Sequence, residues 1–187
     1  AGIDTLAIND SADLSTGELT LTGLERILLV DTKAGDNPLS FTANSSSLTG
    51  QTIAISTVSE TDTAAVTLKV NGSSANFSGI TTSNIDTLTI TAAGSAFPVS
   101  IIGTAGNDIL IGSNGADVLV GGAGNDIIMG GLGANRLTGG LGQDIFVIND
   151  ADSPLRGSAT EFLAAANTIT DFVAGTDKLK LGVAATN

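Results

Sequence analysis

The sequence of 187 residues contains no cysteine, histidine, tryptophan or tyrosine. The absence of cysteine and histidine excludes disulfide bonds, thiolate or imidazole zinc sites, and nucleophilic catalysis of the Cys or Ser-His type. Carboxylate and carbonyl oxygens are then the only plausible metal ligands, and such ligands favour hard cations. Phenylalanine is the only aromatic residue, and aromatic residues make up only 3% of the chain, so aliphatic side chains must fill the core of a chain that is 42% hydrophobic.

Basic residues are scarce, with 7 Lys and Arg against 19 Asp and Glu and a net charge of -12. This surplus of negative charge repels a polyanion, so we expect no nucleic-acid partner. No stretch approaches the roughly 20 apolar residues of a membrane span, and we expect no transmembrane segment. The chain starts at Ala1 without methionine, which suggests a piece of a longer protein.

Residues 1–100 alternate apolar and polar side chains in short segments such as AAVTLKV (64–70), bounded by Gly, Asn, Ser and Asp turns. This pattern suits a solenoid or a sandwich. A weak repeat about 60 residues apart, between 24–41 and 85–101, favours a coil-like stack of strands. We therefore predict a β-strand-rich, solenoid-like region over residues 1–100.

Residues 103–147 divide without gaps into five nonapeptides, GTAGNDILI, GSNGADVLV, GGAGNDIIM, GGLGANRLT and GGLGQDIFV. The first and fourth positions are always Gly, the sixth is Asp or Asn, and the eighth is a large apolar residue. The first six residues of each unit predict a turn and the last three predict a strand, so two units form one coil. The turns of every second unit then stack directly on one another, with a spacing of about 4.8 Å. The sixth positions then form two columns, one with Asp108, Asp126 and Asp144 and the other with Asp117 and Asn135.

Carboxylates stacked this closely repel one another unless a cation lies between successive turns. Calcium fits best, because it accepts about six to eight oxygen ligands in loose geometry. The eighth positions, in contrast, are predicted to form the inward core column: Leu110, Ile128 and Phe146, faced by Leu119 and Leu137.

The five units resemble the repeats-in-toxin (RTX) nonapeptide, GGxGxDxUx, where U is a large apolar residue. The resemblance implies an all-β fold, with a right-handed parallel β-roll or β-helix over residues 101–150 and calcium ions between its turns. It implies about three ions, held by Asp108 with Asp126, by Asp126 with Asp144, and by Asp117 with Asn135, and the tail could add more. Asn135 carries no charge and Arg136 adds a cation, so we expect the third site to be weaker or empty. Further ligands come from the turns, and the candidates are Thr104, Gly106, Ser113, Gly115, Gly121, Gly122, Ala123, Gly124, Gly130, Leu132, Gly139 and Leu141.

Residues 151–187 are predicted to cap the open end of the stack. NTITDF (167–172) and DKLKLG (177–182) read as two closing strands, and 159–167 as a short helical or irregular cover. The segment resembles the one that closes the roll in serralysin-type proteases, through a D-F-x-x-G-x-D signature. That resemblance places Asp171 and Asp177 where they could complete the last calcium sites, and the alternative is that they only form turns and caps.

The RTX resemblance implies export by type I secretion machinery and folding outside the cell, where calcium is available. The Thr/Ser/Ala-rich strands of the first hundred residues resemble RTX-bearing bacterial S-layer proteins. We therefore expect a secreted, extracellular structural protein on the surface of a Gram-negative bacterium, which self-associates into a lattice and has cell-surface polysaccharide as a further partner.

Two alternatives stay open: a non-catalytic C-terminal RTX module of a secreted protease, lipase or epimerase, and an adhesin segment. Neither a Thr grid nor an aromatic platform for an adhesin is evident in the sequence. We expect no enzyme, because the acidic residues of the first region are scattered at strand ends without His or Tyr partners: Asp4, Asp10, Asp13, Glu18, Glu25 and Asp31.

Overall fold

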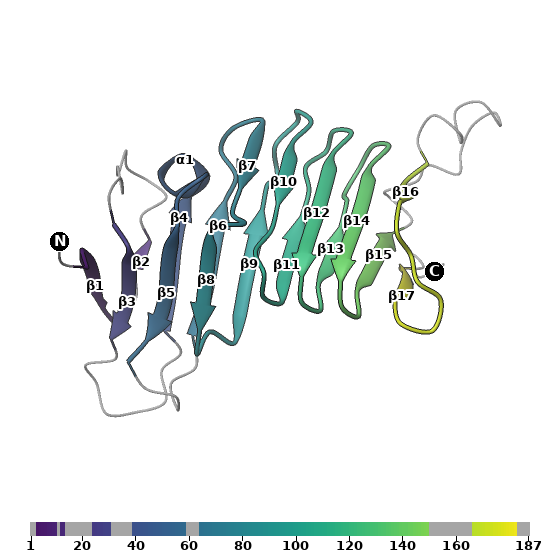
Figure 1. The fold of residues 1–187 in the computed structure, drawn as a ribbon. Coiled ribbons are helices and arrows are strands. Elements are labelled where there is room, and N and C mark those ends of the chain that lie inside the picture. Colours follow the sequence, from purple (N-terminus) through teal and green to yellow (C-terminus); the bar gives the residue numbers. More distant parts are fainter. Residues whose placement is uncertain are drawn as a thin grey trace, which may run out of the picture.

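The chain forms a parallel β-solenoid in a computed structural model that describes residues 3–10, 12–13, 24–30, 39–58, 64–149 and 166–182. Its strands stack along one axis, with the N-terminal strands at one end and the C-terminal strands at the other (Figure 1). Every strand pair of the described residues is parallel. One four-residue helix, α1 (Ser45–Leu48), interrupts the strands. The predicted all-β class is confirmed, as is the parallel solenoid.

The described strands belong to three sheets. The four-stranded sheet contains β1 (Thr5–Asn9), β3 (Arg26–Val30), β5 (Ile53–Thr57) and β8 (Ile80–Ser83). The five-stranded sheet contains β7 (Ser74–Asn76), β10 (Ser100–Ile102), β12 (Val118–Ala123), β14 (Arg136–Leu141) and β16 (Thr168–Ile169). The eight-stranded sheet contains β2 (Ala12–Asp13), β4 (Leu39–Asn44), β6 (Ala64–Lys69), β9 (Thr87–Thr91), β11 (Asp108–Ile111), β13 (Ile127–Met129), β15 (Ile145–Asn149) and β17 (Lys178–Gly182).

The coils of the solenoid are wide near the N-terminus and narrow near the C-terminus. After β6 the chain passes through β7 and β8 before it returns to the eight-stranded sheet at β9. Helix α1 comes before β5 just as β7 comes before β8, so α1 and β7 occupy equivalent places in successive coils. The two places are linked by a hydrogen bond, because the backbone N–H of Asn76 donates to Thr49 Oγ1, 27 residues away in the sequence, at 3.2 Å. From β9 onward each coil of the described residues has only two strands, and between β10 and β15 successive coils are 18 residues apart.

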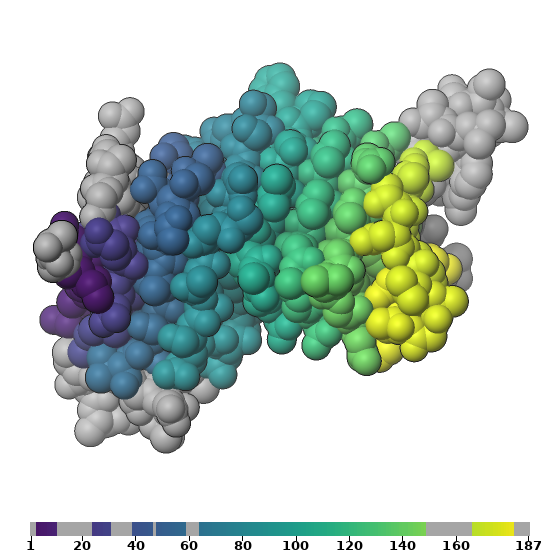
Figure 2. All heavy atoms as spheres, in the orientation of Figure 1, coloured from purple at the N-terminus to yellow at the C-terminus, as the bar shows by residue number. Residues whose placement is uncertain are grey.

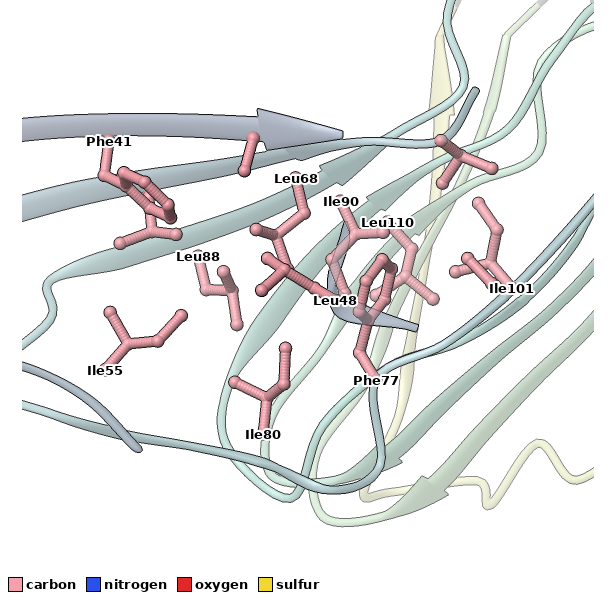
Figure 3. Packing of buried hydrophobic residues seen from close by; sticks show 14 of the residues in the cluster. Phe41, Leu48, Ile55, Leu68, Phe77, Ile80, Leu88, Ile90, Ile101 and Leu110 are labelled. Carbon is pink, nitrogen blue, oxygen red and sulfur yellow. The ribbon is translucent and has the colours of Figure 1, made fainter. Parts of the chain in front are cut away.

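One hydrophobic cluster runs through both parts of the stack. Figure 3 shows Phe41, Leu48 and Phe77 among the aliphatic side chains that fill the wide coils. The narrow coils have room for one inward side chain per strand, and the predicted inward column is confirmed, because all five of its members are fully buried: Leu110, Leu119, Ile128, Leu137 and Phe146. The eight-stranded sheet continues without interruption past residue 100, so the narrow coils grow directly on the wide ones.

The 60-residue repeat does not describe the stack. Its two copies would align β3 with β9, yet these strands lie in different sheets. The reason is that coil length changes along the chain, so a fixed offset does not return to the same sheet. The two closing strands are present as β16 and β17, which extend the five-stranded and the eight-stranded sheet at the C-terminal end (Figure 1). In Figure 2 the described residues of this segment, drawn in yellow, lie at that end of the stack. The expected cover at 159–167 lies outside the described residues except for residues 166 and 167.

Candidate calcium site

Along one edge of the narrow coils, the backbone N–H of each sixth-position aspartate donates to a carboxylate of the following coil. The Asp108 N–H donates to Asp126 Oδ1 at 2.9 Å, and the Asp126 N–H donates to Asp144 Oδ1 at 2.9 Å. The Asp144 N–H donates in turn to Asp177 Oδ1 at 3.1 Å. The structure therefore brings together Asp108, Asp126 and Asp144 in one column, as the repeat predicts, and adds Asp177 as a fourth member. We call this column the acidic edge.

The opposite edge has the same ladder with fewer charges. The Val99 N–H donates to Asp117 Oδ1 at 2.8 Å, and the Asp117 N–H donates to Asn135 Oδ1 at 2.8 Å. The Asn135 N–H donates to Asn167 Oδ1 at 3.0 Å. We call this column the amide edge. Sequence reasoning missed Asn167, although an apolar residue two positions later, Ile169, repeats the spacing between the sixth and eighth positions of a unit.

Hydroxyl groups satisfy the carboxylates of the first two turns. Asp108 accepts bonds from the backbone N–H of Thr104 at 2.6 Å and from its hydroxyl at 3.1 Å. Ser113 donates to Asp117 in the same way, at 2.6 Å from its N–H and 2.7 Å from its hydroxyl. The second position of the third and fifth turns is Gly122 or Gly140, so these turns have no hydroxyl to donate.

The consequence is visible at Asp126, whose side chain is fully buried and whose Oδ2 has no hydrogen-bond partner among the described residues. A buried anionic oxygen without a donor is costly, and a cation removes that cost. Within the described part of the chain no three acidic side chains cluster around one point, so carbonyl oxygens of the turns must supply most of the remaining ligands. Such a donor set, one or two carboxylates with several carbonyls, fits calcium.

Burial dominates the electrostatics of the acidic edge. The pKa of Asp126 is raised to about 7, mainly by burial and to a smaller extent by the charges of Asp108 and Asp144, while the hydrogen bond from the Asp108 N–H lowers it. Burial also raises the pKa of Asp108 to about 6, against the hydrogen bonds from Thr104. The pKa of Asp144 is raised by burial and then by the charges of Asp177 and Asp171. The ionised carboxylates of Asp108, Asp126 and Asp144 are thus destabilised until a cation neutralises them.

Glycine allows the turns to stack closely. Gly140 has a φ of 107°, and a Cβ built on it would collide with the carbonyl oxygen of Gly122 in the turn below. A side chain at this position would therefore push two successive turns apart.

The predicted ligands of the turns lie partly within strands and partly between them. Gly121, Gly122 and Ala123 lie within β12, and Gly139 and Leu141 lie within β14. The carbonyl of Leu141 accepts a bond from the Gly124 N–H at 2.8 Å, and that of Thr104 one from the Ala123 N–H at 3.4 Å. A carbonyl oxygen has a second lone pair, so these bonds leave it able to bind an ion. Seven candidates lie outside the strands: Thr104, Gly106, Ser113, Gly115, Gly124, Gly130 and Leu132. Which carbonyls hold calcium stays a prediction.

The two aspartates of the tail have different roles. Asp171 caps the fifth turn, because its two oxygens accept bonds from the N–H groups of Gly139 and Gly140 at 2.9 and 2.8 Å. Asp177 continues the acidic edge, and its Oδ2 accepts a bond from the Val173 N–H at 2.8 Å. Residues 172–180, FVAGTDKLK, keep the Gly, the Asp and the apolar residue of a nonapeptide, and Leu179 pairs with Phe146 in register.

Comparison with known proteins agrees with this geometry. The family model described as RTX calcium-binding nonapeptide repeat (4 copies) matches residues 100–128 and 111–146. No curated protein matches the chain. RTX repeat proteins are typically secreted and extracellular, and no helix among the described residues is long and apolar enough to cross a membrane. Residues 100–146 are therefore RTX repeats of the calcium-binding kind.

Proposed function

We propose that this chain is a calcium-dependent structural protein of a bacterial cell surface, an S-layer or S-layer-like protein that folds and assembles after type I secretion. The observation that carries the calcium dependence is the buried Asp126 Oδ2, which has no donor within the described residues. We also propose that the chain has no catalytic activity of its own.

Calcium acts in this proposal as a signal that the chain has left the cell. At low cytosolic calcium, ionised carboxylates on the acidic edge oppose the close stacking of the turns. At the millimolar calcium typical of extracellular modules, ion binding contributes directly to the free energy of folding. The Gly-rich turns, which lose much conformational entropy on folding, then become ordered.

Self-association is supported by the outer face of the eight-stranded sheet. Ile109, Ile127 and Ile145 lie in register on neighbouring strands, and a second row lies beside them with Ile111, Met129 and Val147. All six outward side chains are partly exposed. A regular aliphatic surface of this kind fits the same surface of a second copy, which would bury it from water.

The adhesin alternative gains one observation from the fold. Sequence reasoning found no Thr grid, yet the outer face of β9 carries Thr87, Thr89 and Thr91, and the adjacent strands place Thr67 and Thr42 in the same row as Thr89. Parallel pairing over strands of different spacing in the sequence creates this array, which is why the linear pattern did not reveal it. The enzyme-module alternative gains no comparable observation.

The test compares the purified chain in calcium and in chelator. We expect calcium to increase the β-sheet signal in circular dichroism and to produce ordered sheets or end-to-end assemblies in electron microscopy. Met129→Lys, in the middle of the aliphatic rows, should abolish assembly, while calcium should still increase the β-sheet signal of this variant. Val120→Lys, on the outer face of the five-stranded sheet, is the matched control. A β-sheet signal that chelator leaves unchanged would refute calcium-dependent folding, and a strictly monomeric calcium-bound chain would refute the lattice.

A further inference from the structure

The side chain of Asn135 is inserted into its own turn. Its Nδ2 lies 3.1 Å from the carbonyl oxygen of Gly131, 3.3 Å from that of Leu132 and 3.4 Å from that of Gly133. The side chain is 1% exposed. Three carbonyl groups of one turn thus converge on a single donor group, as carbonyl groups converge on a bound cation.

The orientation of this amide follows from its partners. Carbonyl oxygens only accept hydrogen bonds, so the atom that faces three of them must be the NH2 group. The amide oxygen faces the backbone N–H of Asp117, at 2.8 Å, and accepts its bond. Reversing the amide would break all four interactions.

The turn at 121–126 offers a direct comparison. Gly122 and Gly124 have φ values of 125° and 109°, and the equivalent Gly131 and Gly133 have values of 80° and 89°. Both turns are therefore built on left-handed glycines at the same positions. What differs is the sixth side chain. Asp126 presents an oxygen to which no described residue donates, where Asn135 presents an NH2 group with three acceptors.

The preceding turn of the amide edge is also complete. Asp117 accepts bonds from the Val99 N–H, from the Ser113 N–H and from the Ser113 hydroxyl, so both of its carboxylate oxygens have donors. No second carboxylate lies next to it in the described column, because Asn135 and then Asn167 follow it.

We propose that the Asn135 amide replaces a calcium ion, so that the turn at 130–135 closes without metal and calcium binds only along the acidic edge. The inference rests on the proposed calcium-dependent function. It replaces the weak third site, shared by Asp117 and Asn135, that the repeat pattern implies. The narrow coils would then have one edge closed by metal and one closed by permanent hydrogen bonds.

Native mass spectrometry in saturating calcium can count the ions. We expect Asn135→Ala to keep the ion count of the unmodified chain and Asn135→Asp to raise it by one. Asn114→Asp adds the same charge outside the turn at 130–135, at an exposed position of the preceding turn of the same edge, and should leave the ion count unchanged.

Two results would overturn the inference: Asn135→Ala losing an ion, or Asn135→Asp gaining none. The gain is measured relative to the unmodified chain, so it decides the inference whatever that count is. An unmodified chain that binds no calcium at all would instead refute the proposed function.

Discussion

Replacing Asp126 with asparagine should have opposite effects with and without calcium. Asp126 is fully buried, its Oδ2 has no donor in the part of the chain that the structure describes, and its neighbours in the column are Asp108 and Asp144. Asparagine keeps the oxygen that accepts the bond from the Asp108 N–H. It replaces the unpartnered oxygen with an NH2 group, the arrangement already present at Asn135.

The size of the effect follows from the raised pKa. A change from 3.8 to about 7 corresponds to about 4 kcal/mol by which ionised Asp126 destabilises the calcium-free roll at pH above 7. Asp126→Asn should recover a large part of that free energy in chelator. In calcium, the variant loses a carboxylate that reaches from its own turn to the preceding one, so it should bind one or two ions fewer and gain less stability from calcium.

Urea unfolding at pH 8, followed by circular dichroism, measures both effects, and native mass spectrometry measures the ion count. Asp86→Asn is the control, because its carboxylate lies outside the repeats and accepts the Ala64 N–H at 2.7 Å, a bond that asparagine can keep. The reasoning is wrong if Asp126→Asn lowers the stability of the chelated chain, or if it binds as many ions as the unmodified chain.

Three further predictions follow from the same geometry. The folded-state pKa values of Asp108 and Asp126, about 6 and about 7, exceed 3.8, so their contribution to the stability of the folded chain is complete below about pH 4 and is lost as the pH rises through these values. The β-sheet signal of the chelated chain should therefore increase on acidification. A signal that decreases would contradict this reasoning. Gly140→Ala should separate two turns and lower the ion count in mass spectrometry, whereas Gly72→Ala, whose Cβ would meet nothing closer than 3.9 Å, should change neither. Phe146→Ala should cost about 3–5 kcal/mol in urea unfolding with calcium present, because the ring is fully buried and lies 6.2 Å from that of Phe172, centroid to centroid; a cost under about 1 kcal/mol would mean that the narrow coils do not depend on this packing.

The repeats could be predicted because their spacing is strict. An 18-residue coil determines which sixth and eighth positions stack, so the column of Asp108, Asp126 and Asp144 and the buried Leu110 followed from counting alone. The wide coils could not be predicted in this way, because their length varies and a short helix occupies a place that the following coil fills with a strand.

Other features depend on directions that a linear pattern does not contain. The sequence suggested that Asn135 weakens an ion site, but the three carbonyl groups that face its amide are visible only in the folded turn. Asn167 was missed because the residues before it lack the glycines of the repeat, and only its place in the column reveals it.

The side-chain ladders also give the stack a polarity. On both edges the sixth-position side chain of one coil accepts its bond from the coil before it, so each sixth-position N–H is satisfied by the following coil. The fifth-position amides run the opposite way, because Asn107 Oδ1 and Asn125 Oδ1 accept bonds from the N–H groups of Asn125 and Gln143 in the coil after them. The last repeats are completed by Asn167 and Asp177, which accept the N–H groups of Asn135 and Asp144. Losing a coil from the N-terminal side would leave the following side chains without a donor at their surface, where water can replace it. Losing the tail would leave the backbone N–H groups of Asn135 and Asp144 without these acceptors, so the tail closes the C-terminal end of both sixth-position ladders.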